Sequence, residues 1–320
     1  MIMKIASLII SLFLFGSATD CALGQANPWT HSWKAEVKVL DEQGQPVEGA
    51  KVAVWYYVKP PSGQTEASEK AEGVTDTNGV FTASREDSGS VGLGFQAEKS
   101  GYYSARTGHE FAEYKDDAVE KYNPNVTLTL KKVVHPIPMY AQYVAKGPPV
   151  FNASVGYDLM VGDWVAPNGK GITTDIVFNG KLDKKAKDDF DYTLVVSFPK
   201  PGDGIQEFAV PDMEKGSGLR SPHEVPTNGY QFQVVKTMSR HPGQGTKEDM
   251  NDPKRNYFFR VRTALDENGN VVSAHYGKIY GDFMQFTYYL NPTPNSRNIE
   301  FDPKQNLIQG LQSFEQVTAP

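Results

Sequence analysis

The alternation of apolar and polar residues is clearest between Glu36 and Phe81. Val37 and Val39 share one face of the first predicted strand and charged residues share the other, which is the period of a half-buried β-strand. A polar turn with a glycine follows at 41–44, and residues 51–57 then form a second strand rich in β-branched and aromatic side chains. This order predicts a small antiparallel β-sandwich.

Three sequence blocks in this part of the chain resemble the carboxypeptidase regulatory-like domain, a transthyretin-like (prealbumin-like) β-sandwich of the immunoglobulin-like class. They are VLDEQGQPVEGAKVAV, GVTDTNGVF at Gly73–Phe81 and EKSGYYSA at Glu98–Ala105, and they stand in the order usual for the family. The resemblance covers about residues 34–132. It implies an accessory module that props, spaces or binds beside another domain, and it implies no activity.

A second series of short alternating strands extends over about 150–318, for example at 192–198 and 257–262. Many short strands separated by Gly, Pro and Asn turns predict an all-β domain, a larger β-sandwich or jelly roll of unknown function. Short helices are predicted only at 184–189 and 306–314. The fragments NYFFRVRTALDENGNVVSAHYGKIYGDF and TYYLNPTPNSRNIEFDP resemble uncharacterised exported proteins of environmental bacteria.

The segment 133–149 separates the two domains in the sequence. It carries four prolines, at positions 136, 138, 148 and 149. Proline at this spacing stiffens a chain and removes backbone donors, so the segment is predicted to be a Pro-rich linker. An edge strand over 135–140, laid along one domain, is the alternative.

The first 26 residues have the pattern of a signal peptide. A basic start precedes the apolar core Ile5–Phe15, which is too short to span a bilayer, and small residues precede a predicted cleavage after Ala26. The only cysteine, Cys21, follows Thr19-Asp20 instead of the small apolar run of a lipoprotein box. Simple export is therefore favoured over lipid anchoring at Cys21, and the mature chain is expected in the periplasm, at the cell surface or outside a bacterial cell.

Composition and charge limit the classes of binding partner that can be expected. The chain of 320 residues is long enough for two domains, and 39% hydrophobic with 12% aromatic residues supports real cores. The net charge of −6 is spread along the chain without a basic block, which argues against nucleic acid as a partner. No long apolar run follows the signal segment, so no membrane span is predicted. A glycan or a component of the cell envelope is the expected partner, and the oligomeric state stays open.

The sequence lacks the common catalytic motifs. It contains no H-E-x-x-H, no G-x-S-x-G, no P-loop and no G-x-G-x-x-G opening a helix. No cofactor is expected. His223 and His241 lie in two loops rich in Gly and Pro and are weak candidates for metal ligands if those loops meet. The turns 76–79 and 266–270 resemble fragments of calcium loops, but hairpin turns are the better interpretation because the closing Glu and the flanking helices are missing.

Aromatic side chains are the leading candidates for ligand contact, because pyranose rings stack on exposed Trp and Tyr. Trp164, in a loop-like stretch, is the best candidate, followed by Tyr276, Tyr280 and Tyr289. Core packing is the alternative for each strand tyrosine. The adjacent Tyr288 and Tyr289 must face opposite sides of their strand.

Three functions agree with these observations. The favoured one is an exported, non-catalytic binding or surface-associated protein with a carbohydrate ligand. The second is a carbohydrate-active enzyme with its site in the C-terminal β domain. The third is a structural spacer of an envelope assembly, which predicts a flat apolar patch and no cleft. The enzyme would draw its catalytic residues from Asp158, Asp163, Asp175, His223, Glu224, His241, Arg260, Arg262 and His275.

Overall fold

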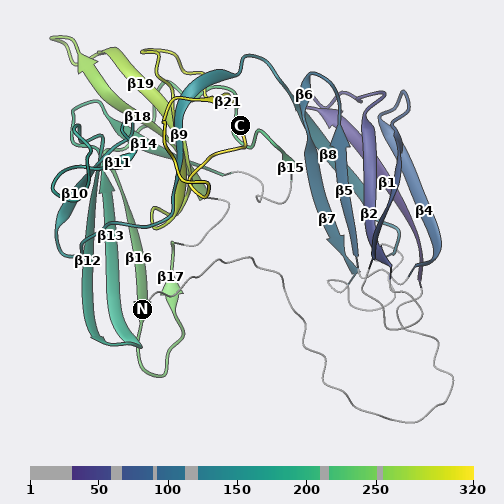
Figure 1. Cartoon of the computed structure of the whole chain (residues 1–320), viewed down its shortest axis with the longest axis horizontal. Helices are drawn as coiled ribbons and strands as arrows, with labels where there is room; N and C mark the ends of the chain where they lie inside the picture. Colours follow the sequence, from purple (N-terminus) through teal and green to yellow (C-terminus); the bar gives the residue numbers. More distant parts are fainter. Residues whose placement is uncertain (1–30, 59–66, 89–91, 112–121, 210–215, 251–254) are drawn as a thin grey trace.

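The computed structural model describes residues 31–58, 67–88, 92–111, 122–209, 216–250 and 255–320. The regular elements among them, β1 to β21, are all strands, and they form two β-sandwiches that lie side by side (Figure 1). The all-β class predicted from the sequence is confirmed. The predicted signal peptide, residues 1–26, lies outside the described residues.

The first sandwich consists of two sheets on one core. One sheet has the strand order β4-β1-β8-β6 and the other β15-β7-β5-β2-β3. All pairs are antiparallel except β1 with β8. The strands are β1 (His31–Asp41), β2 (Lys51–Val58), β3 (Ala67–Val74), β4 (Val80–Ser88), β5 (Gly92–Glu98), β6 (Tyr102–Tyr103), β7 (Ala105–Glu110), β8 (Asn125–Lys132) and β15 (Gly216–Ser217).

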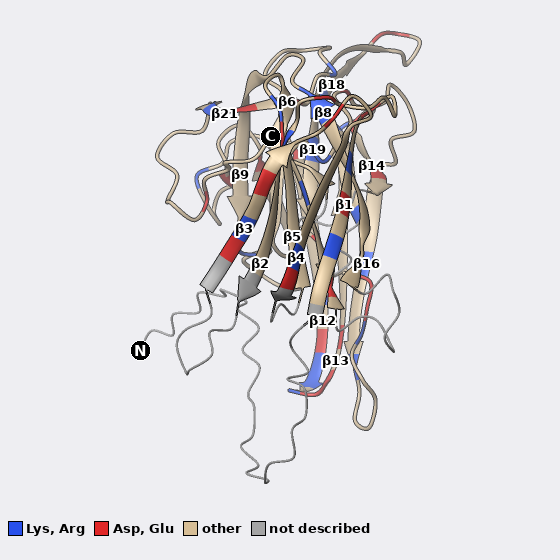
Figure 2. Cartoon of the chain, turned by 90° about the vertical axis from the view of Figure 1, so that its right-hand side faces the viewer, with Lys and Arg blue, Asp and Glu red and all other residues tan. Residues whose placement is uncertain are grey.

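The core of the first sandwich follows the predicted alternation. Val37 and Val39 are fully buried, as are Val52 and Val54 of β2, and Phe95 packs with them. Charged residues occupy the outer positions, and Figure 2 shows acidic and basic residues following one another along β3. One face of each sheet is therefore apolar and the other is solvated, as in most antiparallel sandwiches.

Three turns share one design. In each turn, an aspartate carboxylate accepts hydrogen bonds from the backbone N–H groups two and four residues later. A glycine three residues after the aspartate has a positive φ, which a side chain would disfavour. The hairpin prediction is confirmed for 266–270, which joins the paired strands β18 (Arg255–Leu265) and β19 (Val271–Gly281). Residues 76–79 do form a turn, but it connects β3 and β4, which lie in different sheets. The pairs are Asp41 with Gly44, Asp76 with Gly79, and Asp266 with Gly269.

The second sandwich is larger. Its sheets have the orders β11-β10-β12-β13-β16-β17 and β14-β18-β19-β20-β9-β21. The strands are β9 (Ile137–Val144), β10 (Ser154–Asp158), β11 (Asp163–Trp164), β12 (Ile176–Ala186), β13 (Asp189–Ser197), β14 (Gly204–Ala209), β16 (Gln233–Arg240), β17 (Lys247–Glu248), β18 (Arg255–Leu265), β19 (Val271–Gly281), β20 (Phe286–Leu290) and β21 (Phe301–Asn306).

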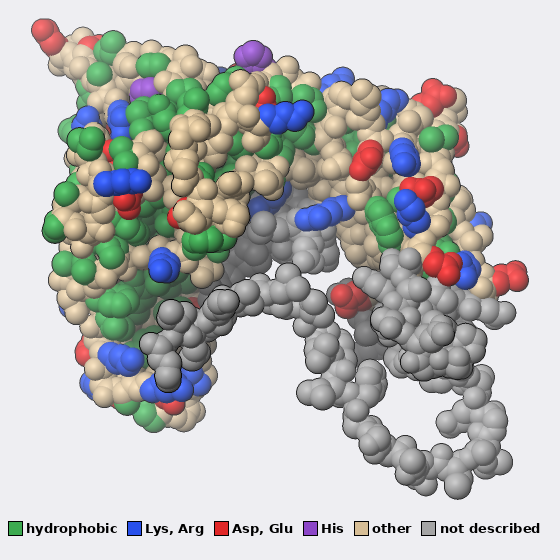
Figure 3. Space-filling view, viewed as in Figure 1, with side chains coloured by type: hydrophobic (Ala, Val, Ile, Leu, Met, Phe, Trp, Pro, Cys, Tyr) green, Lys and Arg blue, Asp and Glu red, His purple; other side chains and the backbone are tan. Residues whose placement is uncertain are grey.

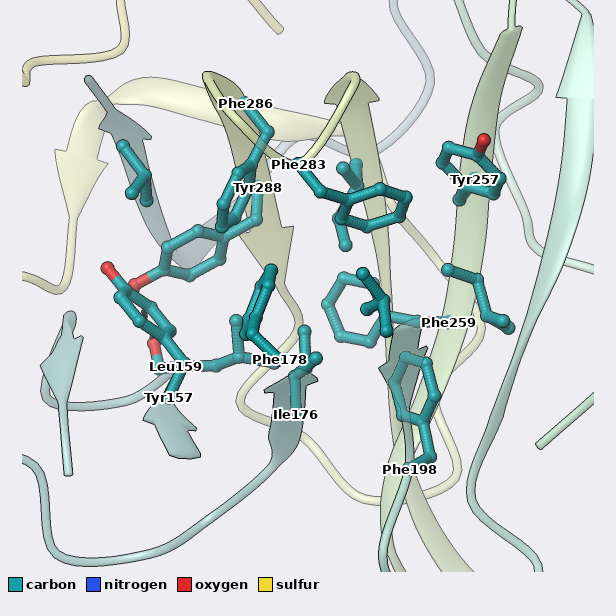
Figure 4. Packing of buried hydrophobic residues seen from close by; sticks show 14 of the residues in the cluster. Tyr157, Leu159, Ile176, Phe178, Phe198, Tyr257, Phe259, Phe283, Phe286 and Tyr288 are labelled. Atoms are coloured by element: carbon teal, nitrogen blue, oxygen red, sulfur yellow. Dashed lines mark hydrogen bonds between the residues drawn. The ribbon is translucent and has the colours of Figure 1, made fainter. Parts of the chain in front are cut away.

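Aromatic rings dominate the core between these two sheets. Phe178 stacks on Phe286 with ring centroids 5.9 Å apart, and Tyr157 meets the edge of Tyr288 at 5.9 Å (Figure 4). Phe259 is fully buried beside them. Offset and edge-to-face packing of this kind adds to the burial of apolar area.

The sheet β14-β18-β19-β20-β9-β21 is buried on both faces. Its second face carries Phe258, Tyr280 and Tyr289, which pack with Phe301 of β21 and with Val225 and Val317 from the chain that covers them. Tyr288 and Tyr289 do face opposite sides, as predicted, yet both are buried, at 0% and 2% exposure. The second sandwich thus has two apolar cores, one on each side of this sheet.

The structure differs from three predictions for irregular or helical segments. The Pro-rich linker predicted at 133–149 contains β9, which lies between β20 and β21 and pairs with both. Pro138 is tolerated because the pairing of β9 with β21 is irregular at that end. The helix predicted at 184–189 is instead the end of β12, a two-residue turn and the start of β13. The helix predicted at 306–314 is instead the last residue of β21 and the irregular chain that follows it.

Candidate functional site

A short strand from the second half of the chain closes a sheet edge of the first sandwich. β15 pairs antiparallel with β7. The N–H of Gly218 then donates to the carbonyl of Ser104 at 2.7 Å. Directly afterwards the chain enters the outer layer of the second sandwich, where Leu219 is fully buried. The segment 216–220 therefore belongs to both sandwiches.

Beside this segment, a cleft of about 740 Å³ lies between the two sandwiches, and Figure 3 shows basic side chains in the hollow there. One wall comes from β5 and β7, and the other comes from β18, β19, β20 and the chain from 314 to 320. Amide, hydroxyl and aromatic side chains line it together with two arginines. No Asp, Glu, Lys or His occurs in its lining among the described residues. Its main polar and aromatic groups are Gln96, Arg106, Arg220, Asn256, Gln285 and Phe314.

Two of the predicted ligand residues, Tyr280 and Tyr289, lie at this cleft, where they form part of its floor. They are 8% and 2% exposed, and their rings meet edge to face at 5.7 Å. The hydroxyl of Tyr280 accepts from the N–H of Ser221 at 3.1 Å, and that of Tyr289 donates to the carbonyl of Ala319 at 3.2 Å. They therefore support the cleft from below and do not form the open platform that was expected.

Trp164 and Tyr276, the other two predicted ligand residues, are not part of the cleft. Trp164 is half-buried and meets the ring edges of Tyr157 and Phe178 at 5.0 and 5.2 Å, so it extends the central core. Tyr276 is 7% exposed and packs against Tyr230. An open aromatic strip does not occur at these positions because the covering chain and neighbouring aromatic rings bury them.

The cleft contains aromatic residues that sequence reasoning missed. Phe314 is 61% exposed, so a large apolar surface faces solvent at the rim. Tyr143 lies nearby, and its hydroxyl donates to Oε1 of Gln285 at 3.2 Å. Phe314 stands in irregular chain after β21. No periodicity distinguishes it, so only the folded structure could have singled it out.

The two histidines proposed as a metal pair lie in different places. His241 contacts the carboxylates of Asp189 and Asp191 at 2.9 and 3.3 Å. His223 contacts Glu42 at 3.2 Å and Glu300 at 3.4 Å. Among the residues that the structure describes, no group of three or more His, Cys, Asp or Glu side chains has a geometry that could hold a metal ion. The metal-pair hypothesis is therefore wrong, because each histidine has its own carboxylate partners.

Three of the residues proposed for an enzyme form a buried ionic cluster away from the cleft. Arg262 lies 2.8 Å from a carboxylate oxygen of Asp175 and 3.0 Å from one of Asp158. Asp158 also accepts four backbone N–H groups, from Met160, Val161, Ile172 and Thr173. Burial opposes ionisation of Asp158, but these hydrogen bonds lower its pKa and keep it charged. The carboxylate oxygens of Asp158 and Asp175 already accept hydrogen bonds from Arg262 and from backbone N–H groups. We therefore interpret the cluster as structural.

The other residues proposed as catalytic do not come together in one site either. Glu224 pairs with Arg297 at 2.6 Å on the surface, and Nε of Arg260 donates to the carbonyl of Gly202 at 2.6 Å. The carboxylate of Asp163 accepts from backbone N–H groups of its own loop, and His275 contacts the carbonyl of Asn291. Each of these groups has a local structural partner, and none belongs to the cleft.

A hydrogen-bonded joint holds the two sandwiches in place around the cleft. The carboxylate of Glu300, 1% exposed, accepts from the hydroxyl of Tyr103 at 2.8 Å and from the N–H groups of Val134 and His135 at 2.9 and 2.6 Å. Nζ of Lys131 donates to the carbonyl of Ser221 at 2.9 Å. Buried charge-assisted hydrogen bonds are among the stronger polar contacts in proteins. The cleft therefore has a defined width.

Comparison with known proteins leaves the family open. No family model matches the chain, and no curated protein matches it. A shaft pilin from Lactobacillus rhamnosus GG is 10% identical, covers 79% of this chain and 95% of its own, and has a TM-score of 0.23. A protein from Bacteroides uniformis proposed to bind carbohydrate is 13% identical, covers 81% of this chain and 97% of its own, and has a TM-score of 0.17. Such low TM-scores carry no argument about function.

Among the described residues, no helix has the length and apolar character needed to cross a bilayer. The comparisons identify no family for this chain. The resemblance of residues 34–132 to the carboxypeptidase regulatory-like domain therefore stays a prediction.

Proposed function

We propose that this is an exported, non-catalytic binding protein of the bacterial cell exterior and that it takes a carbohydrate ligand in the cleft between its sandwiches. The proposal rests on one observation. The cleft between the sandwiches is lined by amide and hydroxyl groups and by an exposed aromatic ring, and no Asp, Glu or His side chain occurs in its described lining. These groups bind sugars, but they supply no general acid or base.

The chemistry of the lining suits a pyranose. The amides of Gln96, Asn256 and Gln285 each carry a donor and an acceptor, which match the paired hydroxyls of a sugar ring. Phe314 offers an apolar face on which the C–H side of a ring can stack. The segment 216–220 contributes backbone and hydroxyl groups beside them. A ligand in this cleft contacts both sandwiches at once.

The two alternatives agree less well with the structure. Glycoside hydrolysis needs two carboxyl groups on either side of the scissile bond. The buried pair Asp158 and Asp175 is held by Arg262 and backbone N–H groups outside the cleft. The spacer alternative predicts a flat apolar patch without a cleft, whereas a cleft of about 740 Å³ lies between the two sandwiches.

A glycan array probed with the full chain tests the proposal. We expect binding to be lost in Phe314→Ala and kept in Phe232→Ala, a matched control because Phe232 is 66% exposed and lies outside the cleft. Trp164→Ala is the third variant. Loss of binding in Trp164→Ala alone would move the site to the β11 loop, and absence of binding to every glycan would refute the proposal.

A further inference from the structure

One histidine stands between acidic groups of the two sandwiches. His223 belongs to the chain that covers the second sandwich, and its Nε2 lies 3.2 Å from Oε2 of Glu42, in the turn after β1 of the first sandwich. On the other side of the ring, Nδ1 lies 3.4 Å from Oε2 of Glu300, directly before β21 of the second sandwich. The imidazole therefore lies between two carboxylates, and each sandwich contributes one of them.

The two ring nitrogens of His223 differ in their contacts. Nε2 is within hydrogen-bond distance of Glu42, whereas Nδ1 is buried and has no hydrogen-bond partner among the described residues. A neutral imidazole has a single N–H group, so it can donate to only one of the two carboxylates. The imidazolium has two N–H groups, and hydrogen bonds from a charged donor to a carboxylate are the stronger kind. Only the protonated ring can therefore donate to both sandwiches.

The other charged or titratable groups near this ring have contacts of their own. They are Lys131 on β8, Tyr103 on β6, Glu224, which pairs with Arg297, and His135, which is exposed. Nζ of Lys131 donates to the carbonyl of Ser221 at 2.9 Å, and the hydroxyl of Tyr103 donates to Glu300 at 2.8 Å. These contacts do not involve the ring of His223, so protonation of the ring leaves them in place.

We infer that His223 is a proton-operated latch between the sandwiches. With the ring protonated, one N–H group holds Glu42 of the first sandwich and the other holds Glu300 of the second. When the ring loses its proton, one carboxylate faces a nitrogen lone pair and that link opens. Histidine is the side chain whose charge ordinarily changes between pH 5 and 8, so the latch loosens as the pH rises through this range. The cleft lies between the same two sandwiches, so its width depends on the latch.

Hydrogen exchange of the full chain between pH 5.5 and 8.5 tests the latch without any ligand, with each rate divided by the intrinsic rate at its pH. The N–H of Lys132 donates to Glu42 at 3.4 Å, and the N–H of Ile299 donates to the carbonyl of His223 at 2.9 Å, so these two amides report on the two sides. We expect the protection of both to fall about fivefold from pH 5.5 to pH 8.5. Protection that does not change with pH overturns the inference and leaves the proposed function standing.

His223→Gln separates the latch from a general effect of pH. The glutamine amide stays neutral and donates from one end only, so protection at pH 5.5 should already be as low as in the unmodified protein at pH 8.5. Glu42→Gln, an independent variant on the first sandwich, should abolish the pH dependence in the same way. His135→Gln is the matched control, because His135 is exposed and contributes its backbone N–H and carbonyl to the joint. A pH dependence that persists in His223→Gln and Glu42→Gln, or that disappears in His135→Gln, means that His223 is not the latch.

Discussion

In the first sandwich, residues that alternate along a strand also alternate between core and solvent. Val37 and Val39 are fully buried, whereas Glu36 and Lys38 beside them are exposed. In the second sandwich, the sheet that contains β20 is buried on both faces, so adjacent residues such as Tyr288 and Tyr289 are both in cores. Alternation along a strand therefore indicates which face of the sheet a residue occupies. Whether that face is exposed to solvent depends on what the rest of the chain packs against it.

The two sandwiches also differ in how they use charge. In the first, ion pairs such as that of Arg85 with Glu69 lie at the surface. In the second, Arg262 is bound to two carboxylates that are 2% and 1% exposed. Surface pairs contribute little to stability, whereas removal of one partner from a buried group leaves an uncompensated charge. Mutations should therefore affect the two sandwiches very differently.

The largest effect is expected from Arg262→Ala. Loss of the guanidinium leaves Asp158 and Asp175 buried without their counter-charge, so the second sandwich should lose about 4 kcal/mol of unfolding free energy. Segment-resolved amide hydrogen exchange measures the loss within each sandwich. Arg85→Ala is the control and should cost less than about 1 kcal/mol. Similar costs for both variants would contradict the contrast between the sandwiches.

Phe301→Ala tests whether the covered face of the second sheet is a true core. Phe301 is fully buried against Tyr289, with ring centroids 5.4 Å apart. A substitution that removes the ring should cost about 3 kcal/mol, measured by chemical denaturation. Phe95→Ala in the single core of the first sandwich provides the comparison. A cost below about 1 kcal/mol for Phe301→Ala would mean that this face of the sheet packs only loosely.

This contrast also explains how much could be predicted from the sequence. The strands of the first sandwich were predictable because each buries one face, and Val37 and Val39 mark that face. The burial of Tyr280 was not predictable from the sequence. The chain that covers it, around Val225 and after β20, is irregular and has no periodic pattern of apolar residues. The cleft was unpredictable for the same reason: Arg106 and Arg220 meet at one cleft only through β15, and a strand of two residues carries no pattern.

Glu300→Gln tests the joint, with an expected cost of about 2 kcal/mol. Burial alone would raise the pKa of Glu300, but hydrogen bonds from His135, Val134 and Tyr103 and the charge of His223 outweigh it, so the pKa is lowered. The stabilisation is therefore complete above the unfolded pKa, about 4.3, and is lost as the pH falls through the lower folded value.

Hydrogen exchange of residues 131–137 as a function of pH measures this effect. In the unmodified protein, protection of the joint should fall as the pH drops below about 4. In Glu300→Gln, protection should be lower at neutral pH and should lack this acid transition. An unchanged acid transition in the variant would show that another group governs the joint.

The smallest effect is expected from His241→Gln. The hydrogen bond to Asp189 raises the pKa of His241, with help from the charges of Asp191 and Asp189. A raised folded pKa means that the stabilisation is present below the unfolded value, about 6.5, and is lost as the pH rises through the folded one. The Tm of the variant should therefore fall slightly below that of the unmodified protein at pH 5.5 and equal it at pH 9. A difference that persists at pH 9 would contradict this assignment.

The contribution of β15 to the first sandwich has a consequence for synthesis in the cell. Of the strands of the first sandwich other than β15, the last is β8, which is complete at Lys132, but β15 begins only at Gly216. At about 5–20 residues per second, the ribosome leaves the edge of β7 uncovered for several seconds. An uncovered edge can pair with a strand of another chain. While the protein is being made, this edge is where a chaperone would be most useful.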